Sequence, residues 1–568
     1  MKKRLMGFLL CFVLLLTMLS GCAKNTTNKS TDSGQGNQNQ SSPTITPTPA
    51  ITAGTANGQT GTEVSYQYQQ DLNIIDDNYR NYYEIFVYSY CDSNGDGIGD
   101  FNGITSKLDY ISNMGFNGIW LMPIMPSPSY HKYDTTDYNT VDPSYGTIED
   151  FQNLINECHK RGIKLIIDYV FNHTSSKHPW FTQAVDYLET LGKDQEPDLS
   201  VCPYVGYYHF VKDKKGSDYY KTGSSDYYYE AVFWDQMPDL ALESKELRAE
   251  IEKNAKFWLD MGVDGFRLDA VKEYFSGETS KNVEVLQWFT DYVKSIKADA
   301  YIVGECWDSA STIASYYKSG ITSIFNYPLA LYNGIITTSV RKLGTSNAKT
   351  FANNIMNLQK IYSESNPGYI DAPFISNHDN TRISAQCVND ENTMKMDAGI
   401  LLTLNGSPFV YYGEEIGMNS MGNNDANKRL PMNWSTTDTT GITKAPPGAD
   451  NVVQKFAPLD EQQKDPLSIA NYYKLALRIR NENPEIARGE LSMVDSLLTN
   501  DVCVFKKVYN GSEIVIVYNM NKEAATVDLK SAGLDNLGIR GYLTVDGSEV
   551  TLTDGVVNMP LYSIVILN

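Results

Sequence analysis

From residue 82 onward, short apolar runs alternate with longer stretches whose apolar residues recur at helical spacing. Eight of the runs have the length of a strand and are apolar almost throughout, which is typical of strands buried on both faces. They cover residues 82–88, 117–123, 164–173, 263–270, 301–307, 322–328, 372–379 and 407–415. Amphipathic stretches such as 147–162 and 244–262 separate several of them. The alternation predicts parallel βα units of an α/β fold, and eight units favour a closed (β/α)8 TIM barrel.

Two regions break this alternation. Residues 174–240 are rich in Tyr and Gly and show no helical period, so we predict a small domain inserted after strand 3. From about residue 485, apolar and polar positions alternate as in strands, and Asn510-Gly511 is typical of a two-residue hairpin turn. The predicted organisation is a barrel built from residues 78–173 and 241–480, the insert between these two parts, and a C-terminal antiparallel β domain over residues 481–568.

The first 21 residues have the basic start and the apolar centre of a secretory signal segment. They lead into LSGC, which resembles the cleavage motif of bacterial lipoproteins and makes Cys22 the expected site of lipidation. Residues 22–77 are largely polar and lack a periodic apolar face, so we expect a tether without a core. The predicted location is the extracellular face of a bacterial cell membrane, held through an N-terminal lipid anchor. A secreted protein without lipid is the alternative.

Charge and cysteine usage exclude some classes of function. The formal net charge of −21 argues against a polyanionic partner such as nucleic acid. The six cysteines after Cys22 are scattered without CxxC pairs, which indicates neither a zinc site nor a dense disulfide framework and leaves one or two disulfides open. The 39 tyrosines suit a sugar ligand, because an aromatic face offers apolar area to a pyranose ring. Most of them are expected to pack in the core.

Residues 92–100 read DSNGDGIGD and carry oxygen-bearing side chains at alternate positions. Such a set suits Ca²⁺, which takes about six to eight oxygen ligands. The predicted ligands are the side chains of Asp92, Asn94, Asp96 and Asp100 and the carbonyl oxygen of Ile98. The loop is not an EF-hand, because its twelfth position is Gly103 instead of Glu. A turn rich in Asn and Gly, without metal, is the alternative.

Polar side chains gather at the carboxyl ends of the predicted strands, where (β/α)8 barrels carry their chemistry. The third strand is followed by Asn172 and His173, the fourth carries Arg267 and Asp269, the fifth ends in Glu305, and the seventh ends in His378 and Asp379. A polar residue that interrupts a buried run is costly unless it is paired. Four such strand ends together therefore indicate an active site rather than separate structural ion pairs.

Four of these segments also carry a family resemblance. DYVFNHT (168–174), GFRLDAVKE (265–273), GECW (304–307) and FISNHDN (374–380) resemble the signature segments of the α-amylase family of glycoside hydrolases, family 13. The similarity covers roughly residues 80–568 and suggests a member intermediate between the oligo-1,6-glucosidase and neopullulanase subfamilies. It implies a (β/α)8 barrel, a small domain after strand 3 and a C-terminal antiparallel β-sandwich. Several members bind Ca²⁺ in a near-identical loop after the first strand, which favours metal at residues 92–100.

The resemblance implies roles for three carboxylates. Asp269 would be the nucleophile, Glu305 the general acid/base, and Asp379 the carboxylate that holds the hydroxyl groups of the cleaved sugar. Retaining glycosidases need two carboxyl groups about 5–5.5 Å apart, one to attack the anomeric carbon and one to protonate the departing oxygen. We expect burial and the charge of Asp379 to keep Glu305 protonated near neutral pH.

The resemblance also implies a set of substrate-binding side chains around the cleaved bond, with Tyr133 as the stacking platform. The set is Tyr133, His173, Arg267, Lys272, Trp307 and His378. The chain departs from the family pattern at two positions. Glu273 stands where many α-amylases have a His of a second calcium site, and Ala241 follows MPDL where Asn is common.

The expected substrates are starch, maltodextrins or related α-glucans, cleaved at internal α-1,4 bonds. Ala270 indicates α-1,4 cleavage. Members of the family that act on α-1,4 bonds tend to carry Ala or Thr after the nucleophile, whereas members resembling oligo-1,6-glucosidase tend to carry Val. An α-glucosidase, an oligo-1,6-glucosidase or a neopullulanase is the alternative. A non-catalytic sugar-binding lipoprotein is disfavoured, because such relatives typically lose one of the three carboxylates. We expect a monomer.

Overall fold

The computed structural model describes residues 74–193, 195–420 and 422–568 of the chain. The predicted signal segment, the lipidated Cys22 and nearly all of the predicted tether lie outside these residues. In the described part of the chain, no helix combines the length and the apolar character that crossing a membrane would require.

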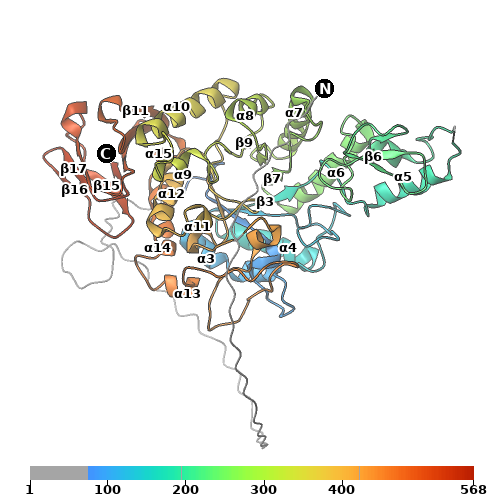
Figure 1. Cartoon of the computed structure of the whole chain (residues 1–568), viewed down its shortest axis with the longest axis horizontal. Helices are drawn as coiled ribbons and strands as arrows, with labels where there is room; N and C mark the ends of the chain where they lie inside the picture. Colours follow the sequence, from blue (N-terminus) through green and yellow to red (C-terminus); the bar gives the residue numbers. More distant parts are fainter. Residues whose placement is uncertain (1–73, 194, 421) are drawn as a thin grey trace, which may run out of the picture. The chain divides into compact units, whose positions relative to one another are not determined.

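A curled parallel sheet forms the barrel. Seven strands are hydrogen-bonded in the order β10-β1-β2-β3-β7-β8-β9, and β3 and β7 run parallel although the inserted segment lies between them in the sequence (Figure 1). The strands are β1 (Tyr82–Ile85), β2 (Gly118–Leu121), β3 (Lys164–Tyr169), β7 (Gly265–Leu268), β8 (Tyr301–Gly304), β9 (Ser323–Ile324) and β10 (Phe409–Tyr411). Each lies within one of the predicted runs. Nearly all their residues are buried, as in a sheet covered on both faces.

The remaining predicted strand, residues 372–379, forms a bridge instead of a regular strand. Ala372 pairs in parallel with Phe325, which follows β9, and the carbonyl oxygen of Pro373 accepts the N–H of Phe409 at 2.9 Å. Pro373 has no N–H to donate, so a regular ladder cannot run through it. The segment still joins β9 to β10 and closes the ring, which confirms the predicted (β/α)8 barrel.

Helices follow the strands as the amphipathic stretches predict. α4 (Ile148–Lys160) begins with a capping box between Thr147 and Asp150 and buries one apolar stripe. α12 (Glu391–Thr403) is instead buried along nearly its whole length, so it carries no amphipathic pattern that could have predicted it. The other helices around the barrel are α1 (Val87–Tyr90), α2 (Phe101–Ser106), α3 (Leu108–Met114), α6 (Lys245–Met261), α7 (Thr279–Ile296), α8 (Ala310–Tyr317), α9 (Ile335–Val340), α10 (Ala348–Ser365), α11 (Ile383–Gln386), α13 (Leu459–Gln462), α14 (Ile469–Glu482) and α15 (Pro484–Arg488).

The insert after β3 contains a helix, which corrects the expectation that residues 174–240 lack one. α5 (Pro179–Thr190) begins with proline at its first position and is capped by the His178 side chain. Its buried face is Phe181, Ala184 and Leu188, a stripe that aromatic and polar neighbours hide in the sequence. A small antiparallel sheet completes the insert in the order β4 (Phe210–Val211), β6 (Tyr228–Glu230), β5 (Tyr219–Lys221).

The C-terminal region forms two antiparallel sheets, which confirms the predicted β-sandwich (Figure 1). One sheet has the order β11 (Glu490–Met493), β12 (Val502–Tyr509), β13 (Ser512–Asn519), β18 (Ser563–Leu567), β15 (Ile539–Thr544), and the other has the order β14 (Ala525–Asp528), β17 (Val556–Met559), β16 (Thr551–Thr553). Valines from both sheets share one core. Asn510 and Gly511 both have positive φ angles, 50° and 80°, as the predicted hairpin turn requires.

The structure also shows the state of the cysteines. All six in the described residues are buried free thiols, so the disulfides left open by the sequence do not form among them.

Candidate active site

Arg267 links three carboxylates inside the barrel. It lies on β7, directly opposite Asp168 of β3. Its Nη1 donates to both carboxylate oxygens of Asp168 at 2.9 Å and to Oδ1 of Asp269 at 2.6 Å, and its Nη2 donates to Oε2 of Glu305. The guanidinium is fully buried. Because an unpaired buried charge is very costly, this cluster holds its members together.

Asp269 and Glu305 follow neighbouring strands, β7 and β8. The backbone N–H of Ala270, the residue after Asp269, lies 3.4 Å from Oε2 of Glu305. Ala270 has a φ of 45°, in the left-handed region that few non-glycine residues occupy and that strains β-branched residues most. The backbone therefore gives a second reason for a small residue after Asp269.

Glu305 has the electrostatic environment of a general acid. Burial raises the pKa of Glu305 to about 7; the charges of Asp269 and Asp379 act in the same direction, and that of Arg267 opposes them. A carboxyl group with this pKa retains a proton near neutral pH. The hydroxyl of Tyr327, which follows β9, donates to Oε1 of Glu305 at 3.3 Å. The expectation of a raised pKa is confirmed in direction, with burial as the largest cause.

His378 is held between two carboxylates. Its Nδ1 lies 2.6 Å from Oε1 of Glu84 on β1, and its Nε2 lies 3.1 Å from Oδ2 of Asp379. Burial opposes a charge on the imidazole, but the two carboxylates outweigh it and raise the pKa of His378 to about 10. His378 is therefore an imidazolium at neutral pH, with both ring nitrogens donating.

Asp379 is correspondingly held ionised. Burial alone would favour its neutral form, but His378 and Arg429 outweigh burial and bring the pKa of Asp379 below its usual range. Nη2 of Arg429 donates to Oδ1 of Asp379 at 2.9 Å. Arg429 is anchored in turn by Asp425, whose Oδ2 accepts from Nη1 at 2.6 Å. The result is a carboxylate that accepts hydrogen bonds and carries no proton of its own.

Tyr133 and His173 lie beside these carboxylates. The Tyr133 hydroxyl donates to Oδ2 of Asp168 at 3.0 Å and lies 2.7 Å from Nε2 of His378. The Tyr133 ring stacks on the imidazole of His378, with 5.5 Å between centroids. Nε2 of His173 lies 3.2 Å from the carbonyl oxygen of Tyr133, and burial lowers the pKa of His173. The structure thus brings Tyr133, His173, Arg267 and His378 to one place, as the sequence predicted.

Trp307 and Lys272 lie at the edge of this site. The indole is about half exposed, at 46%, and stacks on Tyr327 with 5.2 Å between ring centroids and an interplanar angle of 11°. Lys272 donates from Nζ to the carbonyl oxygen of Trp307 at 3.1 Å and lies 3.5 Å from Oδ2 of Asp308. Lys272 therefore supports the loop after β8 and makes no ion pair with the three predicted catalytic carboxylates.

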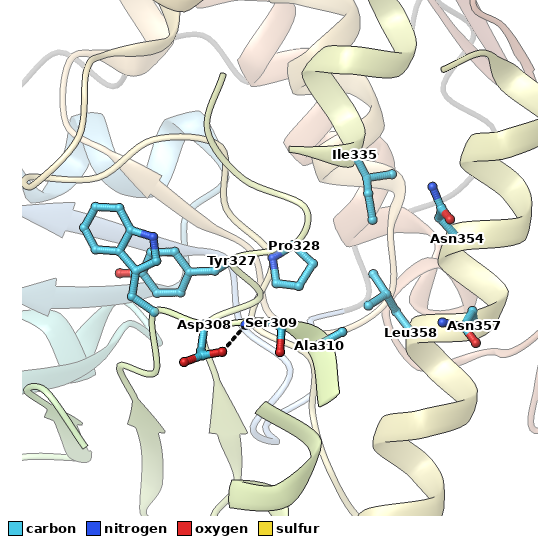
Figure 2. Close-up of a pocket in the computed structure, with 10 residues that line it drawn as sticks. Asp308, Ser309, Ala310, Tyr327, Pro328, Ile335, Asn354, Asn357 and Leu358 are labelled. Carbon is cyan, nitrogen blue, oxygen red and sulfur yellow. Dashed lines mark hydrogen bonds between the residues drawn. The ribbon is translucent and has the colours of Figure 1, made fainter. Parts of the chain in front are cut away.

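A pocket of about 460 Å³ opens beside Trp307 and Tyr327. Figure 2 shows Tyr327 and Pro328 on one side of it and residues of α10 on the other. Its lining residues are Trp307, Asp308, Ser309, Ala310, Tyr327, Pro328, Ile335, Asn354, Asn357 and Leu358. The volume lies within the range of about 300–1,000 Å³ that is usual for small-molecule sites.

The loop at residues 92–100 is folded on itself. The carboxylate of Asp92 accepts backbone N–H groups of its own loop, and that of Asp100 accepts the N–H of Ser93. Nζ of Lys444 donates to the carbonyl oxygen of Asp96 at 2.8 Å. In the described ranges, no group of three His, Cys, Asp or Glu side chains lies close enough together to hold a metal ion. The all-oxygen donor set still has the chemistry that Ca²⁺ prefers, so metal at Asp92, Asn94, Asp96, Ile98 and Asp100 stays a prediction.

Four side chains of the site were not predicted from the sequence: Glu84, Asp168, Tyr327 and Arg429. A signal for Glu84 and Asp168 was present, because each interrupts an apolar strand and a buried polar group needs a partner. Arg429 lies on the short helix η3 (Asp425–Arg429), and Tyr327 follows a two-residue strand. Tyr327 stands near the carboxyl end of the predicted run 322–328, which was a signal, whereas Arg429 lies outside all eight predicted runs.

Comparisons with known proteins agree with this geometry. The family model described as "Alpha amylase, catalytic domain" matches residues 84–489. The chain is 39% identical over 455 residues to Alpha-amylase 3 of Dictyoglomus thermophilum, covering 78% of this chain and 85% of that protein. It is 28% identical to the probable oligo-1,6-glucosidase 2 of Bacillus subtilis, over 78% of this chain and 90% of that protein.

Among solved structures, Eubacterium rectale Amy13B superimposes with a TM-score of 0.86 at 45% identity, over 88% of this chain and 97% of that one. The barrel, the cluster of carboxylates at its strand ends and these matches lead to one assignment: the chain belongs to the α-amylase family and is a glycoside hydrolase.

Proposed function

We propose that this glycoside hydrolase cleaves internal α-1,4-glucosidic bonds of starch and maltodextrins with retention of configuration. The observation that carries the proposal is the shared guanidinium of Arg267, which contacts both Asp269 and Glu305. Retaining glycosidases need their two carboxyl groups about 5–5.5 Å apart, and a single planar guanidinium can hold two carboxylates at short range.

The mechanism assigns each group one task. Asp269, which accepts a hydrogen bond from Arg267, attacks the anomeric carbon and forms a covalent glycosyl ester, while Glu305 gives its proton to the departing glycosidic oxygen. Glu305, now ionised, then takes a proton from water as the water breaks the ester, which restores both carboxyl groups. Asp379 and His378 act as acceptor and donor for the hydroxyl groups of the same sugar.

Aromatic surfaces on two sides support cleavage within a chain. Trp307 stacks on Tyr327 beside Glu305, and Phe233 of the insert lies 5.5 Å from the ring of His173 and is 49% exposed. Exposed aromatic faces suit pyranose rings, so glucose units can be bound on either side of the cleaved bond. The name of the Dictyoglomus relative, an α-amylase, agrees with this substrate class.

We further propose that Ca²⁺ binds the loop at residues 92–100, through its oxygen donors. The loop follows β1 and is separate from the Arg267 cluster, so the ion would stabilise the fold and take no part in the reaction. The extracellular location and the lipid anchor at Cys22 are likewise proposed, on the signal-like sequence of the first 22 residues.

A product profile tests the function. The purified enzyme is incubated with soluble starch, pullulan, maltotriose and isomaltose, and products are followed by chromatography and by NMR of the first anomer released. We expect short maltodextrins of α configuration from starch and little cleavage of isomaltose. Release of β-anomers would contradict the retaining mechanism.

An oligo-1,6-glucosidase is the second candidate, favoured by the 28% identity to a relative with that name. It predicts glucose from isomaltose, with long maltodextrins left intact. Ala270 supports the α-1,4 proposal, because members resembling oligo-1,6-glucosidase tend to carry Val at this position.

A further inference from the structure

Lys132 stands directly before Tyr133, in the loop between β2 and α4, and its backbone is strained. Its φ angle is 62°, in the left-handed region that glycine adopts freely and that other residues avoid. Such a conformation persists only where the surrounding contacts outweigh the strain. The strain therefore indicates that the Lys132 side chain makes a contact that a glycine could not make.

The Lys132 side chain is buried against an acidic partner. Its Nζ donates to Oδ2 of Asp142 at 2.7 Å and lies 4.9 Å from the centre of the Tyr145 ring. Only 7% of the Lys132 side chain and 9% of the Asp142 side chain are exposed. Asp142 is itself fixed, because its N–H donates to the carbonyl oxygen of Ile124 at 2.7 Å. The ion pair thus ties residue 132 back to the segment that follows β2.

The next residue, Tyr133, reaches the centre of the site. Its hydroxyl donates to Oδ2 of Asp168 and lies 2.7 Å from Nε2 of His378. Its ring stacks on the imidazole of His378 with an interplanar angle of 13°. Because a planar peptide bond joins residues 132 and 133, a change in the backbone of Lys132 reorients the Tyr133 ring.

We infer that Lys132 is a positioning residue, whose ion pair with Asp142 holds the strained turn that presents Tyr133 to His378 and to the sugar in the site. Lys132 acts through Tyr133 and takes no part in the chemistry. The inference rests on the proposed function, because it takes Tyr133 as a wall of the sugar site.

The test removes the ion pair and relieves the strain at the same time. In Lys132→Gly/Asp142→Asn, the glycine adopts a φ of 62° freely, and no buried charge is left without its partner. If the lysine side chain has no positioning role, kcat/KM for maltohexaose stays unchanged, which overturns the inference. We expect kcat/KM to fall roughly a hundredfold, as a misplacement of about 1 Å can cause.

Lys342→Gly/Asp501→Asn is the matched control. Lys342 also has a left-handed backbone, with a φ of 51°, and also forms an ion pair with an aspartate. This pair joins the segment after α9 to the C-terminal domain, so kcat/KM of the control should equal that of the wild type. Equal losses in the two double variants overturn the inference.

NMR of His378 separates positioning from a loss of stability. The chain has six histidines, so selective ¹³C labelling of histidine gives few signals. The Tyr133 ring shifts the His378 signal through its ring current, because the two rings are stacked. In Lys132→Gly/Asp142→Asn the signal should move toward its position in Tyr133→Ala. An unmoved signal in the folded double variant overturns the inference.

A double-mutant cycle shows whether Lys132 acts through Tyr133. In a Tyr133→Ala background, the substitutions at Lys132 and Asp142 should lower kcat/KM by less than about twofold, because the group that they position is already gone. A loss as large as in the wild-type background overturns the inference.

Two further outcomes are covered by the same measurements. If Lys132→Gly/Asp142→Asn does not fold, Lys132→Met/Asp142→Asn replaces it, since methionine keeps the apolar stem of the lysine. If the wild type does not hydrolyse maltohexaose, the proposed function is wrong. The His378 signal then decides the inference alone, and an unmoved signal overturns it.

Discussion

Nδ1 of His378 lies 2.6 Å from Oε1 of Glu84, although 294 residues separate the two in the chain. Glu84 belongs to β1, and His378 follows the irregular segment that closes the barrel between β9 and β10. The ring closure therefore brings a carboxylate against the imidazole and raises the pKa of His378 to about 10. A protonated His378 then faces Asp379 and keeps that group ionised.

Glu84→Gln should lower the pKa of His378, because the amide removes one of the two charges that hold the imidazolium. The kcat/KM for maltohexaose should fall about tenfold or more, because the variant weakens the charged hydrogen bond that positions the imidazole, and such a bond contributes about 1.5–3 kcal/mol. NMR titration of the imidazole measures the pKa directly. Glu415→Gln is the control, because this carboxylate is also buried but accepts from Tyr83 and Tyr110. A wild-type pKa in Glu84→Gln would contradict the role of this pair.

Asp269→Asn and Glu305→Gln should each remove nearly all hydrolysis of starch while the thermal midpoint stays within a few degrees of the wild type. Loss of a general acid/base alone typically costs about 10²–10⁴-fold. Initial rates on starch and a melting curve are the measurements. Glu364→Gln, an exposed carboxylate on α10, serves as the control for the substitution itself. The assignment fails if either purified variant turns over near the wild-type rate.

The pH profile should carry an alkaline limb set by Glu305. Its pKa is raised to about 7, so the protonated form that donates to the glycosidic oxygen is present below this pH and disappears above it. We expect kcat/KM for maltohexaose to fall about tenfold for each pH unit well above 7. With α-maltotriosyl fluoride the limb should weaken, because fluoride needs little protonation to leave. Identical limbs for both substrates would show that another group titrates.

Removal of calcium should lower thermal stability more than it lowers activity at low temperature. If the free ion is present at about 100 times its Kd, its binding stabilises the folded chain by about 2.7 kcal/mol. Calorimetry with and without a chelator measures the shift. Asp96→Ala should abolish the response, whereas Asp213→Ala, an exposed aspartate in the insert, should keep it. A wild type that melts at the same temperature in both buffers has no such site.

Cys22→Ser should release the enzyme from membranes into the medium. The reason is that lipid on Cys22 is the proposed anchor, and serine cannot accept it. Fractionation of cells that express each form, followed by mass spectrometry of the mature N-terminus, gives the answer. An unmodified wild-type protein found in the medium would rule out the anchor.

Much of the fold and the three carboxylates follow from local patterns. A strand that is buried on both faces must be apolar throughout, so the eight runs were visible in the sequence. Asp269, Glu305 and Asp379 stand near the carboxyl ends of three of these runs, and the carboxyl ends of parallel strands share one face of a barrel. Local patterns did not predict α5 and α12. The apolar stripe of α5 is hidden among aromatic residues, and α12 is buried on all sides.

The partners of these carboxylates depend instead on the closed ring. Glu84 contacts His378 across 294 residues of the chain, and Arg429 contacts Asp379 from the short helix η3, 50 residues later. A hydrogen bond needs donor and acceptor within about 3 Å, and no periodicity along the chain encodes which distant segments come that close. Local sequence therefore places the chemical groups at the mouth of the barrel, whereas the folded ring sets their protonation, because charge in a buried site depends on the neighbours that the fold supplies.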